Sequence, residues 1–146
     1  MEKSFFAVTI LCAIYLFDKQ EYVEAVYPGV QGNLALLKFG SSSSKNNSDT
    51  GVGRAVNGDM GNTAYDHLAA TKGPPEDNNP WLCVNVGDNY LIQNIKIVSR
   101  LDCCLDQMET LEARVGTTNN DNFGNTNELC GEPVDMNNKP SHVFRC

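Results

Sequence analysis

The sequence is poor in basic residues. Its 146 residues include 11 Lys and Arg against 18 Asp and Glu, which gives a formal net charge of −7 at pH 7. The basic residues form no stripe or run. Nucleic-acid binding needs a lysine and arginine surface that neutralises phosphates, so this composition argues against a nucleic-acid partner.

The chain also lacks an apolar run long enough to cross a bilayer. Residues 5–17 form an apolar run of thirteen residues, whereas a transmembrane helix needs about 20. This run follows Lys3 and precedes Val23-Glu24-Ala25, whose small residues have the spacing that signal peptidase reads. We therefore expect residues 1–25 to be a secretory signal peptide, residues 26–146 to form one domain, and the protein to be secreted and acidic, with no membrane span.

Catalytic motifs are missing as well. The sequence has no G-x-S-x-G, no phosphate-binding loop and no recognisable pair of catalytic carboxylates. The adjacent Cys103 and Cys104 invite comparison with a redox dithiol, but a reactive thiolate needs a helix N-terminus or nearby cations. Arg100 beside an acidic segment supplies little of that, so we expect the protein not to be an enzyme.

The cysteines that remain after removal of residues 1–25 are odd in number. Cys12 is lost, and five are left: Cys83, Cys103, Cys104, Cys130 and Cys146. In an oxidising compartment an odd number implies a free or intermolecular thiol, or a partner missing from the chain. Cys103 and Cys104 either form a strained ring with each other or bridge to different partners. Zinc is a weaker alternative, because no C-x2-C pair is present.

Short strands separated by polar loops predict an all-β domain, a sandwich or jelly roll. Residues 81–86 and 90–98 alternate with period two across Gly87, which predicts a hairpin-like pair with a buried face. The other expected strands are residues 32–39 and 111–116, and the expected loops are 41–49, 51–65, 72–79 and 117–127. In the first of these loops, Asn46-Asn47-Ser48 is an N-glycosylation sequon at Asn46.

Four motifs carry a family resemblance. They are Asn33-Leu34-Ala35-Leu36, Ala55-Val56-Asn57-Gly58-Asp59, Asn79-Pro80-Trp81 and Arg100-Leu101-Asp102-Cys103-Cys104. In this order, the chain from about residue 33 to residue 146 resembles the F-type lectins, or fucolectins. The last two motifs are the specific ones. The resemblance implies a secreted, discoidin-like jelly-roll β-sandwich that binds terminal L-fucose on glycans.

The resemblance also implies which residues hold the sugar. Arg100 and Asp102 match the arginine and aspartate of the family motif, and a Cys103–Cys104 disulfide would pack on the sugar ring. Two further positions depart from the family, because its second basic residue is Gln107 here and its histidine is Gly73. Lys72, next to Gly73, and His67, six residues before it, are the candidate substitutes.

These departures weaken the expected sugar site. A charged hydrogen bond is worth roughly 1.5–3 kcal/mol and a neutral one about 1, so two weakened contacts would cost ~2–4 kcal/mol, a factor of ~30 to 1,000 in affinity. The alternative function is therefore a domain of the same fold with a drifted sugar site, which recognises a protein or another glycan in cell or gamete adhesion.

A calcium ion and a second disulfide complete what the resemblance implies. Asn57 and Asp59 would supply oxygen ligands to Ca²⁺, a suitable donor set for a hard cation. Cys130 and Cys146 would pair, which leaves Cys83 as a buried cysteine without a partner. Similar domains continue beyond the position of Cys146, so we expect the jelly roll to be incomplete at its C-terminal end. Homo-oligomers are expected by analogy, since weak single sites gain from multivalency.

Overall fold

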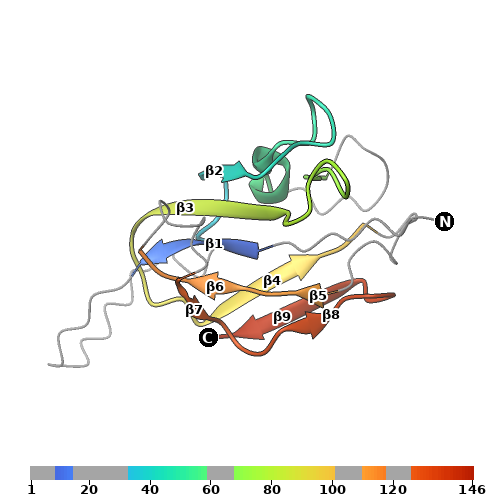
Figure 1. The fold of residues 1–146 in the computed structure, drawn as a ribbon. Helices are drawn as coiled ribbons and strands as arrows, with labels where there is room; N and C mark the ends of the chain where they lie inside the picture. The colour runs from blue at the N-terminus through green and yellow to red at the C-terminus, as the bar shows by residue number, and fades with distance from the viewer. Residues whose placement is uncertain (1–8, 15–32, 59–67, 101–109, 118–125) are drawn as a thin grey trace, which may run out of the picture.

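The structure, a computed structural model, describes residues 9–14, 33–58, 68–100, 110–117 and 126–146, with residues 9–14 described by their backbone alone (Figure 1). The described chain is nearly all β, which confirms the all-β class predicted from the sequence. Its elements are β1 (Thr9–Ile14), β2 (Phe39–Ser42), the 3-10 helix η1 (Val52–Val56), β3 (Trp81–Asn89), β4 (Asn94–Val98), β5 (Thr110–Leu111), β6 (Arg114–Val115), β7 (Glu128–Leu129), β8 (Val134–Asp135) and β9 (Ser141–Arg145).

Strand β3 is the middle strand of a three-stranded sheet with the order β1-β3-β2. β1 runs parallel to it, with Ile10 opposite Leu82, and β2 runs antiparallel, with Phe39 opposite Asn85. The consecutive residues Leu82, Cys83 and Val84 are all buried. Because neighbouring side chains of a strand point to opposite faces, this strand is covered on both faces.

The remaining strands form three antiparallel pairs. β4 pairs with β9 over five residues, from Asn94 opposite Arg145 to Val98 opposite Ser141. β5 pairs with β8, and β6 pairs with β7. β1 contacts β6 as well as β3, and Figure 1 shows it between the two. β1 therefore connects the β3 sheet to the paired strands.

The described interior contains two apolar clusters. The first gathers η1 and β3 through Val52, Val56, Leu82, Val84 and Val86. The second gathers β5, β9 and the segments between them through Leu111, Ala113, Cys130, Met136 and Phe144. Val115 of β6 packs against both clusters, so the two halves of the interior meet at that strand.

The predicted hairpin of residues 81–98 is wrong, although strand β3 itself is confirmed and extends to Asn89. The next strand begins only at Asn94 and pairs with β9 instead of β3. The reason is packing. Tyr90 and Ile92 contact the first cluster, whereas Ile95 and Ile97 contact the second. This segment crosses from one cluster to the other and cannot fold back along β3.

The strand predicted over residues 32–39 is also displaced. Residues 34–37 form a turn, in which the backbone N–H of Ala35 donates to Asn33 Oδ1 at 3.1 Å and that of Leu36 donates to the Asn33 carbonyl at 3.0 Å. Such local side-chain bonds compete with strand pairing. β2 begins at Phe39 and runs to Ser42, inside the predicted loop. The strand predicted over residues 111–116 is divided between β5 and β6.

Replacing Phe144 tests the second cluster. Phe144 is 2% exposed, and Phe144→Ala is expected to lower the free energy of unfolding by about 3–5 kcal/mol, because it removes a buried ring and leaves a cavity. Phe39→Ala is the matched control, since Phe39 is 90% exposed. Urea unfolding followed by circular dichroism measures both. Equal losses in the two variants would contradict the assigned core.

Candidate functional site

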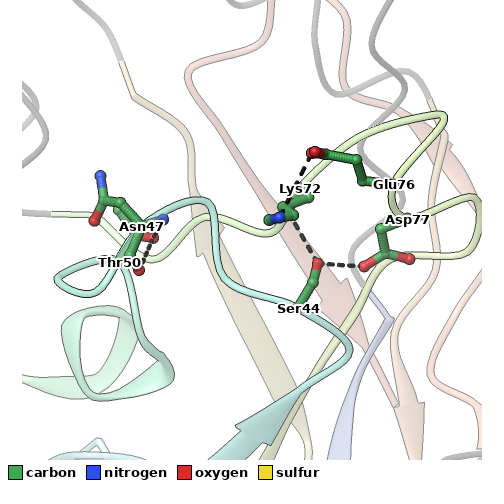
Figure 2. A network of polar contacts seen from close by, with 6 residues as sticks. All are labelled: Ser44, Asn47, Thr50, Lys72, Glu76 and Asp77. Carbon is green, nitrogen blue, oxygen red and sulfur yellow. Dashed lines mark hydrogen bonds and ion pairs between the residues drawn. The ribbon is translucent and has the colours of Figure 1, made fainter.

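Asp77 joins two segments that lie far apart in the sequence. Its Oδ2 accepts hydrogen bonds from the hydroxyls of Ser43, at 2.5 Å, and Ser44, and its Oδ1 accepts one from the backbone N–H of Asn79 at 3.2 Å. Figure 2 shows the bond from Ser44. The carboxylate therefore holds the loop of residues 72–81 against the chain that follows β2.

The same serines fix both ends of this loop. At its end, Ser43 Oγ accepts a bond from the Trp81 N–H at 3.0 Å, and the Ser43 N–H donates to the Trp81 carbonyl at 3.0 Å. At its start, Ser44 Oγ accepts a bond from the Lys72 N–H at 3.0 Å (Figure 2). A hydroxyl donates and accepts at once, so each serine links the Asp77 carboxylate to a backbone donor. We call residues 72–81 the Asp77 loop.

The Asp77 loop carries two of the predicted sugar-site positions. The Lys72 ammonium lies 3.7 Å from Glu76 Oε2, and the two side chains are 41% and 63% exposed (Figure 2). An ion pair so exposed is weak, so the ammonium can exchange Glu76 for a ligand. The Gly73 carbonyl accepts bonds from the N–H groups of Glu76 and Asp77, at 3.1 Å each. Gly73 therefore shapes the loop without offering a side chain.

Arg100, the next predicted contact, lies just beyond β4. The Ser99 N–H donates to the Pro140 carbonyl at 2.9 Å, which continues the β4–β9 pairing by one residue. Arg100 is half-buried and interacts with other groups of the protein. Five other predicted sugar-site residues lie outside the described residues: Asp102, Cys103, Cys104, Gln107 and His67.

The predicted calcium ligand Asn57 terminates η1. It is half-buried, and Gly58 after it has a φ of 79°, a conformation that favours glycine. An amide oxygen on such a tight turn suits a hard cation, so Asn57 fits the role of one ligand. Asp59 lies outside the described residues. Within the described residues, no group of three or more His, Cys, Asp or Glu side chains gathers as a metal site.

The disulfide between Cys130 and Cys146 is confirmed, with the two Cα atoms 4.3 Å apart. Cys130 is buried in the second cluster, and its N–H donates to the Ala113 carbonyl at 2.7 Å. The Cys146 N–H donates to the Gln93 carbonyl at 2.9 Å. The bond spans 16 residues and contributes about 3 kcal/mol in the chain-entropy model. It fastens the end of β9 to the core.

The prediction that Cys83 has no partner is wrong. Cys83 is disulfide-bonded, and at 7% exposure it is buried, as predicted. Its partner is neither Cys130 nor Cys146, because these two are bonded to each other. The full chain has six cysteines, an even number. This even number was the sequence signal that Cys83 could be paired. It was missed because Cys12 was subtracted together with the signal peptide.

An open depression of about 540 Å³ lies beside Ser44 and is lined by Gly40, Ser41, Ser42, Ser44, Lys45 and residues 51–53. Ser44 belongs both to this depression and to the contacts of Asp77. Sequence reasoning treated the serine run only as loop and missed Ser43, Ser44 and Asp77. Nothing local marked them, since Ser43 and Asp77 are 34 residues apart.

Two further predictions concern the surface. Asn46 is exposed, and its N–H is bonded to the Ala70 carbonyl at 2.9 Å, which holds the sequon at the surface. An exposed turn is the setting that N-glycosylation requires. Among the described residues, no helix has the length and apolar character needed to span a membrane.

Replacing Asp77 tests the anchoring of the loop. Asp77→Ala removes the acceptor of two hydroxyl bonds and one backbone bond. We expect it to lower the free energy of unfolding by about 2–4 kcal/mol, because each of these three solvent-exposed or partly exposed bonds is worth about 1 kcal/mol. Hydrogen exchange of the loop amides is expected to rise at the same time. Glu76→Ala is the control, since an exposed ion pair contributes less than about 1 kcal/mol. Unchanged exchange in Asp77→Ala would contradict the anchoring.

Comparisons of the chain with protein-family models, with curated proteins and with solved structures found no match. The resemblance to F-type lectins is thus carried by the four sequence motifs.

Proposed function

We propose that this chain is a secreted carbohydrate-binding protein of the F-type lectin kind, which recognises terminal L-fucose on glycans with the support of calcium. The observation that carries the proposal is the Cys130–Cys146 disulfide, because it is the one pairing that the resemblance required and the described residues contain. The all-β architecture supports the same proposal. In this proposal, the strands would belong to a discoidin-like jelly roll.

Arg100 is the principal sugar contact in this proposal. A guanidinium presents forked donors, which suit two adjacent sugar hydroxyls. Asp102 would accept a bond from Arg100 and orient it, and a Cys103–Cys104 disulfide would offer an apolar platform to the sugar ring. The β4–β9 pairing and the Ser99 bond to Pro140 hold the backbone up to Ser99, and Arg100 follows directly after this supported segment.

Lys72 would replace the charge that Gly73 and Gln107 fail to supply. Its ammonium is partly exposed and, among the described residues, is paired with Glu76. The backbone beneath it is fixed through Ser44 and Asp77. A fixed loop loses little conformational entropy on binding, which raises the affinity of a weak monosaccharide site. His67 is the second candidate for this role.

Calcium would act on the loop that follows η1. Asn57 and Asp59 would hold the ion, which would neutralise the carboxylate and order the turn. The protein carries out no reaction in this proposal, and its partners are fucosylated glycans and glycoproteins. A homo-oligomer would multiply weak single sites into useful avidity.

A second function is favoured by a specific observation. The Lys72 ammonium faces the Glu76 carboxylate, and Gly73 has no side chain where the family has a histidine. Leu37 and Phe39, near the start of β2, are 74% and 90% exposed and offer apolar contact to a protein. The alternative is therefore a recognition module for a protein or another glycan, on the same fold, in cell or gamete adhesion.

A glycan array separates the two functions. The secreted protein is expected to bind fucosylated glycans selectively, and Arg100→Ala is expected to reduce the signal about tenfold or more, since a charged hydrogen bond is worth about 1.5–3 kcal/mol. A chelator is expected to weaken binding as well. Arg145→Ala is the matched control, because Arg145 is an exposed arginine of β9. Folded protein without any fucose signal would contradict the lectin proposal and favour the alternative.

A further inference from the structure

Strand β2 has one edge without a strand partner among the described strands. In the sheet order β1-β3-β2 it is the outermost strand, and only β3 of the described strands pairs with it. Figure 1 shows it on the side of β3 opposite to β1. The edge of a sheet presents unpaired N–H and C=O groups, to which an extended segment can add as a further strand.

The outward groups of this edge belong to Gly40 and Ser42. The Ser43 N–H donates to the Trp81 carbonyl at 3.0 Å, so Ser43 directs its main-chain groups toward β3. These directions alternate along an antiparallel strand. Ser41 therefore also directs its N–H and C=O toward β3, whereas Gly40 and Ser42 direct theirs away from it. Each of these two residues offers one donor and one acceptor to an added strand.

The open depression lies along the same edge. It has a volume of about 540 Å³, and its lining includes Gly40 and Ser42 as well as residues 51–53, where η1 begins. A Cβ added at Gly40 would collide with Val52 Cγ1, so the side-chain position of Gly40 faces η1. Ser42 is two residues along the strand and faces the same way. The depression is thus on the side that receives the side chains of an added strand opposite Gly40 and Ser42.

Lys45 gives this depression a positive charge. It is one of the lining residues, and a Cβ added at Gly51 would lie 3.5 Å from Lys45 Cε and 3.7 Å from its Nζ. The ammonium therefore lies over Gly51. Within the part of the chain that the structure describes, Lys45 takes part in no ion pair and no side-chain hydrogen bond. A carboxylate is the complement of such an ammonium.

Phe39 gives the edge an apolar contact on its other face. Its side chain is 90% exposed, and the alternation of the strand places it on the face opposite to that of Gly40 and Ser42. In an added antiparallel strand, the residue directly opposite Phe39 would belong to a non-hydrogen-bonded pair, in which side chains lie close together. An apolar side chain there would cover part of the exposed ring.

We propose that the outer edge of β2 binds an extended peptide that runs antiparallel to β2, with a glutamate or aspartate opposite Ser42 and an apolar residue opposite Phe39. Main-chain bonds to Gly40 and Ser42 supply affinity, and Lys45 selects the carboxylate. An acidic sugar would satisfy Lys45 alone, whereas a strand also satisfies the main-chain groups. No predicted sugar contact takes part, so the peptide site is independent of the proposed lectin function.

The test uses the folded, isotope-labelled secreted protein and the capped pentapeptide Thr-Glu-Val-Ser-Val. In the proposed register its Glu stands opposite Ser42, its Ser opposite Gly40 and its last Val opposite Phe39. The amide signals of Gly40, Ser42 and Lys45 are expected to shift in an NMR titration, and hydrogen exchange of the Gly40 and Ser42 amides is expected to slow. Unchanged signals at millimolar peptide, or shifts confined to other strands, would overturn the proposal.

N-methylation of the peptide tests the main-chain bonds. The N–H of the peptide Ser points toward β2 in this register, and that of the central Val points away. Methylation at Ser is expected to weaken binding about tenfold, which corresponds to a loss of about 1.4 kcal/mol. Methylation at the central Val is the matched control and is expected to leave the affinity nearly unchanged. Equal effects at the two positions would overturn strand addition, including the case of a site that recognises only an acidic group.

The charge is tested with a second peptide that has Gln in place of Glu. We expect it to bind about three- to fivefold more weakly than the Glu peptide, since an exposed ion pair contributes little. Lys45→Met is expected to abolish this difference. Lys96→Met, which removes an exposed lysine of β4, is the matched control and is expected to retain it. The same preference for Glu in Lys45→Met would overturn the role of Lys45.

Discussion

The pairing of β3 on both of its edges is the constraint on which the described structure depends. Leu82, Val84 and Val86 are buried residues of the first cluster. They are shielded from solvent because β3 has a paired strand on each side. The candidate site inherits this arrangement. The register that places Ser42 opposite Leu82 brings Ser43 beside Trp81 at the end of the β2–β3 pair. Asp77 then has two serine hydroxyls within reach.

A separate part of the molecule supports Arg100. β4 is paired with β9 along its length, and the Cys130–Cys146 disulfide joins the chain end after β9 to the second cluster. Lys72 is thus positioned by the β2–β3 pair, and Arg100 is positioned by the β4–β9 pair. In the proposed lectin, a sugar would connect contacts from both. A weak ligand gains from contacts that are already in position, because each side chain that has to become ordered on binding costs entropy and lowers the affinity.

Local sequence patterns predicted the features that depend on neighbouring residues. The period-two alternation of residues 81–86 predicted β3, and the absence of helical periodicity predicted the all-β class. The partners of β3 were not predictable, since pairing is decided by contacts between distant segments. The alternation of residues 90–98 is compatible with a hairpin. The structure differs because the apolar side chains of this segment pack against two different clusters.

The residues of the candidate site also fall into those that the sequence predicted and those that it did not. The family motifs selected Arg100 and Asn57, and the resemblance gave the Cys130–Cys146 pairing. Lys72 was chosen as a substitute because it lies next to Gly73, where the family has a histidine. The Asp77 contacts escaped notice, because serines and one aspartate more than thirty residues apart look like ordinary loop residues. Cys83 was misjudged for a different reason: the five cysteines were counted after Cys12 had been subtracted with the signal peptide, whereas the full chain has six.

The most direct test of the central claim, that the Asp77 loop and the end of β4 form one sugar site, is an NMR titration of isotope-labelled protein with methyl α-L-fucoside. The amide signals of Lys72, Gly73 and Arg100 are expected to shift together, with a single dissociation constant, in the presence of calcium. Shifts confined to strands away from both segments, or shifts of the two segments with different dissociation constants, would contradict it.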